Sequence, residues 1–169
     1  VEAEVALLGS IILNNEVARR VGQRFPDVKL RTIAYNYYRL PPNIKGFRYE
    51  PNIIVQIPNA TPEIIQQWKP FARHLWVYET YSYAAWGKNH VPRPMVYAMR
   101  EDIPRYRAQG VTGFYTQWMQ QPWYQVPLNH YIAAKLAWNA DLDVDWLVND
   151  YCEKFFEAAS APMRDYLVE

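Results

Sequence analysis

The stretch that decides the fold class is Asn52-Ile53-Ile54-Val55-Gln56-Ile57, followed closely by Thr61-Pro62-Glu63. The first segment is almost continuously apolar, which is typical of a strand that is covered on both faces. Thr61 is a favoured N-cap, and proline is favoured at the first helical position, so a helix is expected to follow at once. A buried strand that leads directly into a helix predicts one β/α unit of a parallel sheet.

The same alternation continues on both sides of this unit. Further strands are predicted over residues 30–38, 74–81 and 111–117, and further helices over residues 15–25, 99–108, 128–138, 144–158 and 161–167. Asp143 or Asp145 is expected to cap the helix over residues 144–158. The sequence therefore predicts an α/β fold of about four β/α units with trailing helices, either half of a TIM-type (β/α)₈ barrel or a small open sheet.

The composition, 50% hydrophobic and 21% charged over 169 residues, predicts one globular domain. The chain has 18 Lys and Arg against 17 Asp and Glu, and the basic residues are scattered, so nucleic acid is not expected as a partner. The apolar runs are far shorter than the ~20 residues that span a bilayer, so no membrane span is expected. The single cysteine, Cys152, excludes an internal disulfide and is expected to be a buried, inert thiol.

The aromatic content of 16% is high for a core of this size, and flat rings with a polar edge suit surfaces that bind sugars. Trp68, Trp138 and Trp146 fall at apolar helical positions and are predicted to lie in the core. The histidines His74, His90 and His130 lie in different elements without metal-ligand spacing, so neither a metal nor a cofactor is expected.

Several stretches, in the same order and spacing, resemble one family; they are Thr32-Ile33-Ala34-Tyr35 with Pro41-Pro42, Pro51-Asn52-Ile53-Ile54-Val55, Trp76-Val77-Tyr78-Glu79-Thr80-Tyr81, Gly110-Val111-Thr112-Gly113-Phe114 and Tyr131-Ile132-Ala133-Ala134-Lys135-Leu136-Ala137-Trp138-Asn139. The family is the bacterial glycoside-hydrolase-like domain of unknown function 4838, which is related to the alpha-glucuronidases. The resemblance implies a secreted or periplasmic protein with a (β/α)₈ barrel that acts on or binds polysaccharide. Such a barrel needs ~250 residues, and this chain resembles only its C-terminal half. Residues 1–14 are then a junction or truncated lead-in, and residues 128–169 are C-terminal helices.

In a parallel barrel the functional site lies at the carboxyl ends of the strands. The candidate side chains there, including those in the loops that follow, are Tyr35, Asn36, Tyr37, Gln56, Glu79, Tyr81, Trp86, His90, Gln117 and Trp118. Glu79 is the sole acidic residue in the four predicted strands, which makes it the candidate acid/base of a glycoside hydrolase. A salt bridge or the orientation of a sugar hydroxyl would explain the same residue without catalysis.

The loop aromatics Trp86, Trp118, Trp123 and Tyr124 are interpreted either as stacking platforms for sugar rings or as packing at the rim of the barrel. Two functions stay open at this point. The chain is either part of a glycoside hydrolase acting on polysaccharide or on uronic-acid-containing oligosaccharide, or a non-catalytic module that binds carbohydrate. In the second case the half-barrel could also pair with its missing N-terminal half or with a second copy of the chain.

Overall fold

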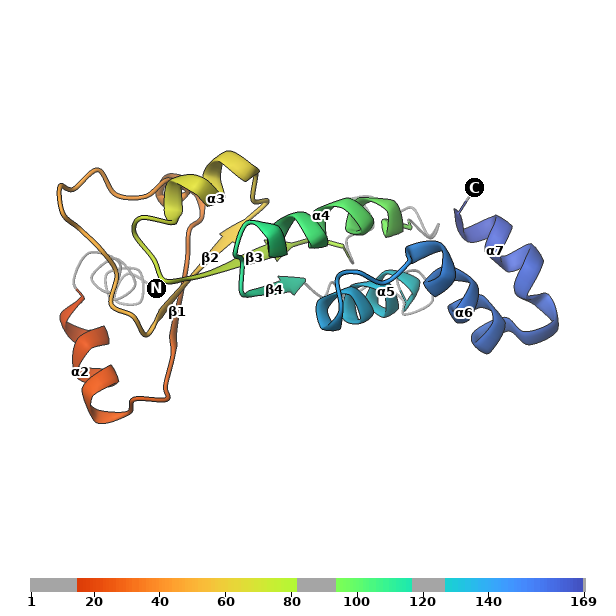
Figure 1. Ribbon diagram of the computed structural model, residues 1–169, viewed down its shortest axis with the longest axis horizontal. Helices are drawn as coiled ribbons and strands as arrows, with labels where there is room; N and C mark the ends of the chain where they lie inside the picture. Colours follow the sequence, from red (N-terminus) through yellow and green to blue (C-terminus); the bar gives the residue numbers. More distant parts are fainter. Residues whose placement is uncertain (1–14, 82–93, 117–126, 169) are drawn as a thin grey trace. The chain divides into compact units, whose positions relative to one another are not determined.

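The structure is a computed structural model that describes residues 15–81, 94–116 and 127–168 (Figure 1). The elements, in chain order, are α2 (Glu16–Arg24), β1 (Leu30–Ile33), η1 (Asn36–Tyr38), β2 (Ile53–Pro58), α3 (Pro62–Trp68), β3 (His74–Glu79), α4 (Val96–Ala108), β4 (Gly113–Thr116), α5 (Pro127–Trp138), α6 (Val144–Phe156), η3 (Glu157–Ala159) and α7 (Ser160–Val168). Two compact units can be distinguished, the first unit Val1–Tyr78 with Gln109–Tyr115 and the second unit Glu79–Ala108 with Thr116–Glu169. Because two compact units can belong to one domain, the predicted single domain stays a prediction.

The four strands form one parallel sheet in the order β1-β2-β3-β4, which confirms the predicted mixed α/β class. In the register between β1 and β2, Thr32 lies opposite Val55, and between β2 and β3, Gln56 lies opposite Trp76. Because the strands are parallel, their carboxyl ends lie at the same edge of the sheet.

The central strand β2 confirms the prediction made from its apolar run, since all of its residues are buried. The helix that follows begins as expected: Pro62 is its first residue, and the Thr61 hydroxyl accepts a hydrogen bond from the backbone nitrogen of Ile64 at 3.4 Å. Trp68 at the end of α3 is buried, as predicted. Each fully buried Val or Ile side chain contributes about 1.5–3 kcal/mol, so β2 anchors the first unit.

The strand predicted over residues 30–38 is too long, because β1 ends at Ile33 and a 3₁₀ turn follows over Asn36–Tyr38. Asn36 adopts a left-handed backbone with φ of 50°, a conformation that interrupts an extended strand and that asparagine tolerates better than most residues. The strand predicted over residues 74–81 is likewise too long, since β3 ends at Glu79, and the strand predicted from residue 111 begins only at Gly113.

A close approach between β3 and β4 depends on a glycine. A Cβ atom on Gly113 would lie 2.7 Å from Cε2 of the Trp76 indole, which is closer than real Cβ atoms come to other atoms. The indole therefore occupies the space that a side chain at position 113 would need, and glycine is the residue that allows the two strands to pair at this point.

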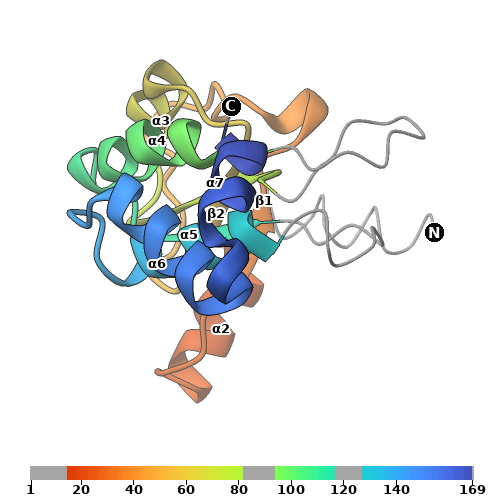
Figure 2. The same cartoon turned by 90° about the vertical axis from the view of Figure 1, so that its right-hand side faces the viewer.

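The second unit is helical, and α4 packs on α5, α5 on α6 and α6 on α7 (Figure 2). Its buried residues include Met99, Ile132, Leu136, Leu147 and Cys152. Asp143 accepts a hydrogen bond from the backbone nitrogen of Trp146 at 2.8 Å, so the predicted cap of α6 is confirmed, and the buried position of Cys152 is confirmed as well. Within residues 15–81, 94–116 and 127–168, no helix has the length and apolar character needed to cross a bilayer.

The prediction that Trp138 and Trp146 lie in the core is wrong. Trp138 is 93% exposed and Trp146 is 55% exposed. A helix turns by about 100° per residue, so each tryptophan, two residues beyond the buried Leu136 and Val144 respectively, points away from the packed face. Both helices carry more apolar residues than their buried faces hold, which is why apolar spacing alone gave the wrong answer.

Candidate functional site

The last residue of β3 is a buried glutamate. Glu79 lies on the same face of the strand as Leu75 and Val77, because side chains alternate along a strand, and the residue is only 9% exposed. The hydroxyl of Tyr106 on α4 donates a hydrogen bond to Glu79 Oε1 at 2.5 Å. Glu79 thus lies at the carboxyl end of a parallel strand, at the edge where sites in such sheets gather.

Glu79 belongs to a network of polar side chains in the second unit. The hydroxyl of Tyr81 donates a hydrogen bond to Asp102 Oδ2 at 3.2 Å, and Arg105 forms an ion pair with Asp102 Oδ1. Asp102, Arg105 and Tyr106 follow one another at intervals of three and one residues along α4, which places them on one side of that helix. One face of α4 therefore carries a phenol that bonds to Glu79 and two charged groups, Asp102 and Arg105, whose charges act on it.

This environment changes the acidity of Glu79. Burial raises the pKa of its carboxyl to about 7; the hydrogen bond from Tyr106 and the charge of Arg105 oppose that rise, and the charge of Asp102 reinforces it. Burial also raises the pKa of the Tyr81 and Tyr106 phenols, so both remain neutral hydrogen-bond donors. Near neutral pH Glu79 can therefore either release or accept a proton.

A buried asparagine connects the segment after Glu79 to α5. Asn129 Nδ2 donates to the Tyr81 carbonyl at 2.8 Å, and Asn129 Oδ1 accepts from the Met95 backbone nitrogen at 2.9 Å. Both backbone groups flank the residues that join β3 to α4, so this side chain holds the two ends of that connection. The sequence did not lead us to predict a role for Asn129, although a polar residue within the apolar run of α5 could have indicated one.

Sequence reasoning also missed the three partners of Glu79 on α4. The signal was present, because Asp102, Arg105 and Tyr106 have the spacing of one helical face and follow Glu79 by one β/α connection. Among the predicted residues, the structure brings Glu79 and Tyr81 into the same network.

The other predicted residues that can be placed belong to the first unit. Tyr35, Asn36 and Tyr37 are exposed in the turn after β1, and Tyr37 is 99% exposed. Gln56 lies on β2, opposite Ile33 in the register, and is buried; its Nε2 atom has no hydrogen-bond partner among the residues that the structure describes. The remaining predicted residues, Trp86, His90, Gln117 and Trp118, and the loop aromatics Trp123 and Tyr124, lie outside the described residues.

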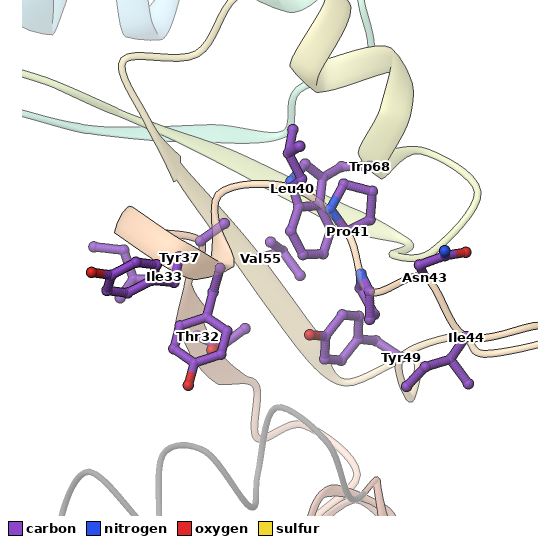
Figure 3. A pocket seen from close by; sticks show the side chains of 13 residues that line it. Thr32, Ile33, Tyr37, Leu40, Pro41, Asn43, Ile44, Tyr49, Val55 and Trp68 are labelled. Carbon is purple, nitrogen blue, oxygen red and sulfur yellow. The ribbon is translucent and has the colours of Figure 1, made fainter.

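A cavity of about 390 Å³ opens in the first unit at the carboxyl end of β1 (Figure 3). Its walls come from β1, from the turn after it, from the loop over residues 40–44, and from Tyr49, Val55 and Trp68. Of the predicted site residues in the first unit, Tyr37 lines this cavity. The sequence placed aromatic residues near this strand end but did not indicate the cavity, because Trp68 from α3 and Val55 from β2 complete it.

In the part of the chain that the structure describes, no three His, Cys, Asp or Glu side chains gather in a way that could hold a metal ion. A carboxyl that titrates near neutral pH, next to a second carboxylate and two phenols, can donate or accept a proton at a substrate oxygen.

The chain was also compared with known proteins. No curated protein and no solved structure matches it. One family model, described as Domain of unknown function (DUF4838), matches residues 7–169, which is nearly the whole chain. The resemblance noted in the strands and in α5 is therefore confirmed at the level of the family, and this chain belongs to the DUF4838 family.

Proposed function

We propose that this chain forms half of a carbohydrate-active (β/α) barrel and that Glu79 is the acid/base of a glycoside hydrolase. Four parallel strands in chain order, with α3 between β2 and β3 and α4 between β3 and β4, support the barrel, because a TIM barrel is built of eight such strands with helices between them. The suggested kinship of the family with alpha-glucuronidases supports polysaccharide, or an oligosaccharide that contains uronic acid, as the substrate class.

The observation that carries the proposal is the placement of Glu79 at the carboxyl end of a parallel strand, buried and held by Tyr106. Glycoside hydrolysis needs a carboxyl that is still protonated at the working pH, and the pKa of about 7 meets that need. In this reaction Glu79 gives its proton to the glycosidic oxygen while the bond from that oxygen to the anomeric carbon breaks. Water or a second carboxylate then attacks the anomeric carbon.

Asp102 has a supporting part in this proposal. One of its oxygens accepts from Tyr81 and the other pairs with Arg105, so its carboxylate is held in place rather than presented for attack. Its fixed negative charge favours the protonated form of Glu79. The attacking carboxylate is therefore proposed to come from another strand of the complete barrel.

A non-catalytic function is favoured by one observation, the low exposure of Glu79. Glu79 is 9% exposed and accepts a hydrogen bond from α4, so the role of its carboxyl would be limited to fixing the end of β3 in place. The module would then bind carbohydrate without cleaving it, through exposed aromatics such as Tyr37. The two functions differ in turnover and can be separated by experiment.

The test is hydrolysis of aryl glycosides and uronic-acid oligosaccharides by the wild type, by Glu79→Gln and by Glu101→Gln. Glu101 is the matched control, because it is an exposed carboxylate on the same helix that carries Tyr106. We expect Glu79→Gln to lower kcat by roughly 10²–10⁴-fold, the usual contribution of a general acid or base, and Glu101→Gln to keep full activity. Equal activity in all three proteins would overturn the catalytic assignment, and sugar binding without turnover would favour the module.

Among the strands that the structure describes, β1 and β4 lie at the two ends of the sheet, and unpaired strand edges favour association. We propose that the missing barrel half or a second copy of the chain covers them, in a secreted or periplasmic protein. Sedimentation of the chain should give the mass of a dimer, or of a complex when the other half is added. A compact monomer that does not bind the other half would count against this pairing.

A further inference from the structure

The cavity in the first unit has the properties of a small-molecule site. Its volume of about 390 Å³ falls within the roughly 300–1,000 Å³ that is usual for ligand pockets. Tyr49 and Trp68 provide aromatic walls, Leu40 and Pro41 lie on the loop side, and Val55 lies between the loop and β1 (Figure 3). Most of the lining is apolar, so an occupant must offer a substantial apolar surface.

The walls are held in place before any ligand binds. Trp68 Nε1 donates to the Arg39 carbonyl at 2.8 Å, and Arg39 Nη2 in turn donates to the Asn59 carbonyl at 3.1 Å. The Tyr49 backbone nitrogen donates to the Phe71 carbonyl at 2.8 Å. These contacts tie the loop after β1 to α3 and β2, so binding does not have to order the loop.

One polar atom in this cavity lacks a partner. Thr32 is only 6% exposed, and within the described part of the chain its Oγ1 atom makes no hydrogen bond. A buried hydroxyl without a partner costs about 1–3 kcal/mol. A ligand oxygen that reached this hydroxyl would remove that cost, which gives the site a polar anchor among mostly apolar lining residues.

The lining carries no charged side chain among the described residues. The Tyr49 phenol is neutral as well, because burial raises its pKa to about 12. A carboxylate placed here would lose its hydration without gaining a cation, which costs several kcal/mol. The site therefore favours an uncharged ligand over an acidic one.

We propose that this cavity binds an uncharged six-membered ring that places its apolar face against Tyr49 and Trp68 and an oxygen at its edge on Thr32 Oγ1. A neutral pyranose ring and a phenolic ring both have this chemistry. The site does not depend on the hydrolase proposal, since none of its residues belongs to the Glu79 network.

Calorimetric titration with three probes tests the proposal: methyl xylopyranoside as the neutral sugar, phenol as the aryl ring, and glucuronate as the charged sugar. We expect saturable binding of at least one neutral probe, and the probe that binds identifies the source of the ring. Glucuronate is expected to bind at least tenfold more weakly than methyl xylopyranoside if the sugar is the ligand, and not to bind if phenol is. Absence of binding by both neutral probes, or glucuronate binding as tightly as the neutral probe, overturns the proposal.

The variants are Thr32→Val, which removes the hydroxyl at nearly constant volume, and Thr112→Val as a matched control outside the cavity. Thr32→Val should weaken binding roughly tenfold, the loss of one buried hydrogen bond, and Thr112→Val should not. Leu40→Trp fills the cavity from the exposed loop and should block binding even if Thr32→Val folds poorly. Unchanged affinity in Thr32→Val and Leu40→Trp would overturn the site, whereas Glu79→Gln should bind the neutral probe like the wild type.

Discussion

Tyr106 donates a hydrogen bond from its hydroxyl to Glu79 Oε1 at 2.5 Å, although the two residues are 27 positions apart in the sequence. This contact joins the carboxyl end of β3 to the last turns of α4. It also opposes the effect of burial on Glu79, because a donor stabilises the ionised carboxylate. Tyr106 therefore influences both the position and the acidity of the candidate catalytic group.

The first prediction concerns Tyr106→Phe. Loss of the donor removes an interaction that favours the ionised form, so the pKa of Glu79 should rise further, by roughly one unit for one hydrogen bond to a charged group. Titration of the Glu79 carboxyl followed by carbon NMR measures the change, and any pH profile of activity should shift its alkaline limb in the same direction. Tyr131→Phe, which removes a hydroxyl that donates to Asp150, is the control and should leave the midpoint in place.

The second prediction concerns stability and pH. The pKa of Glu79 is raised in the folded protein, from 4.5 to about 7, so folding favours the protonated form. The stability that Glu79 contributes is complete below the unfolded pKa and is lost as the pH rises through the folded pKa. The difference of about 2.5 units corresponds to about 3 kcal/mol.

Urea unfolding at about pH 5 and pH 8 measures this change. Glu79→Gln, which cannot ionise, should gain stability relative to the wild type as the pH rises, while the exposed control Glu101→Gln should follow the wild type. A constant difference between wild type and Glu79→Gln at both pH values would contradict the burial of this carboxyl.

The third prediction concerns Gly113→Ala. Its Cβ would lie 2.7 Å from the Trp76 indole, so the substitution should destabilise the fold by about 1–3 kcal/mol through overpacking. Trp76→Leu in the same chain should relieve part of this cost. A double-mutant cycle from chemical denaturation measures the coupling, and strictly additive effects would show that the two side chains do not compete for space.

The fourth prediction concerns Asn129→Leu. The substitution leaves the Tyr81 carbonyl and the Met95 nitrogen without their amide partner, which should cost about 1–3 kcal/mol for each group. Asn139→Ala is the control, because Asn139 accepts from an exposed backbone nitrogen after α5 and its loss should cost less than about 1 kcal/mol. Equal losses in thermal unfolding would show that Asn129 is not the anchor described above.

The sequence predicted the parts of the fold that depend on local signals. The buried strand β2 and the start of α3 follow from an apolar run and from Thr61-Pro62, and both are confirmed. The predicted end of the strand over residues 30–38 was wrong. The left-handed backbone of Asn36 occurs beside many different sequences, so the neighbouring residues did not indicate it. Trp138 was misplaced because exposure depends on which helix face finds a partner.

For the candidate site, the sequence identified Glu79 because it was the one acidic residue among the predicted strands. The spacing of Asp102 and Tyr106 placed them on one face of a helix, but it did not show that this face meets Glu79, because that contact depends on how α4 returns to the end of β3. The sequence also gave no sign of the cavity at Thr32, because Tyr49 and Trp68, which line it together with Thr32, are distant in sequence.

The strands of the sheet are arranged in the order in which they occur along the chain. During synthesis on the ribosome, each new strand can therefore join an edge that already exists, without waiting for residues that have not yet emerged. Sequential pairing keeps the loops that must close short, which speeds folding and limits the time for which an apolar strand such as β2 is exposed to other nascent chains.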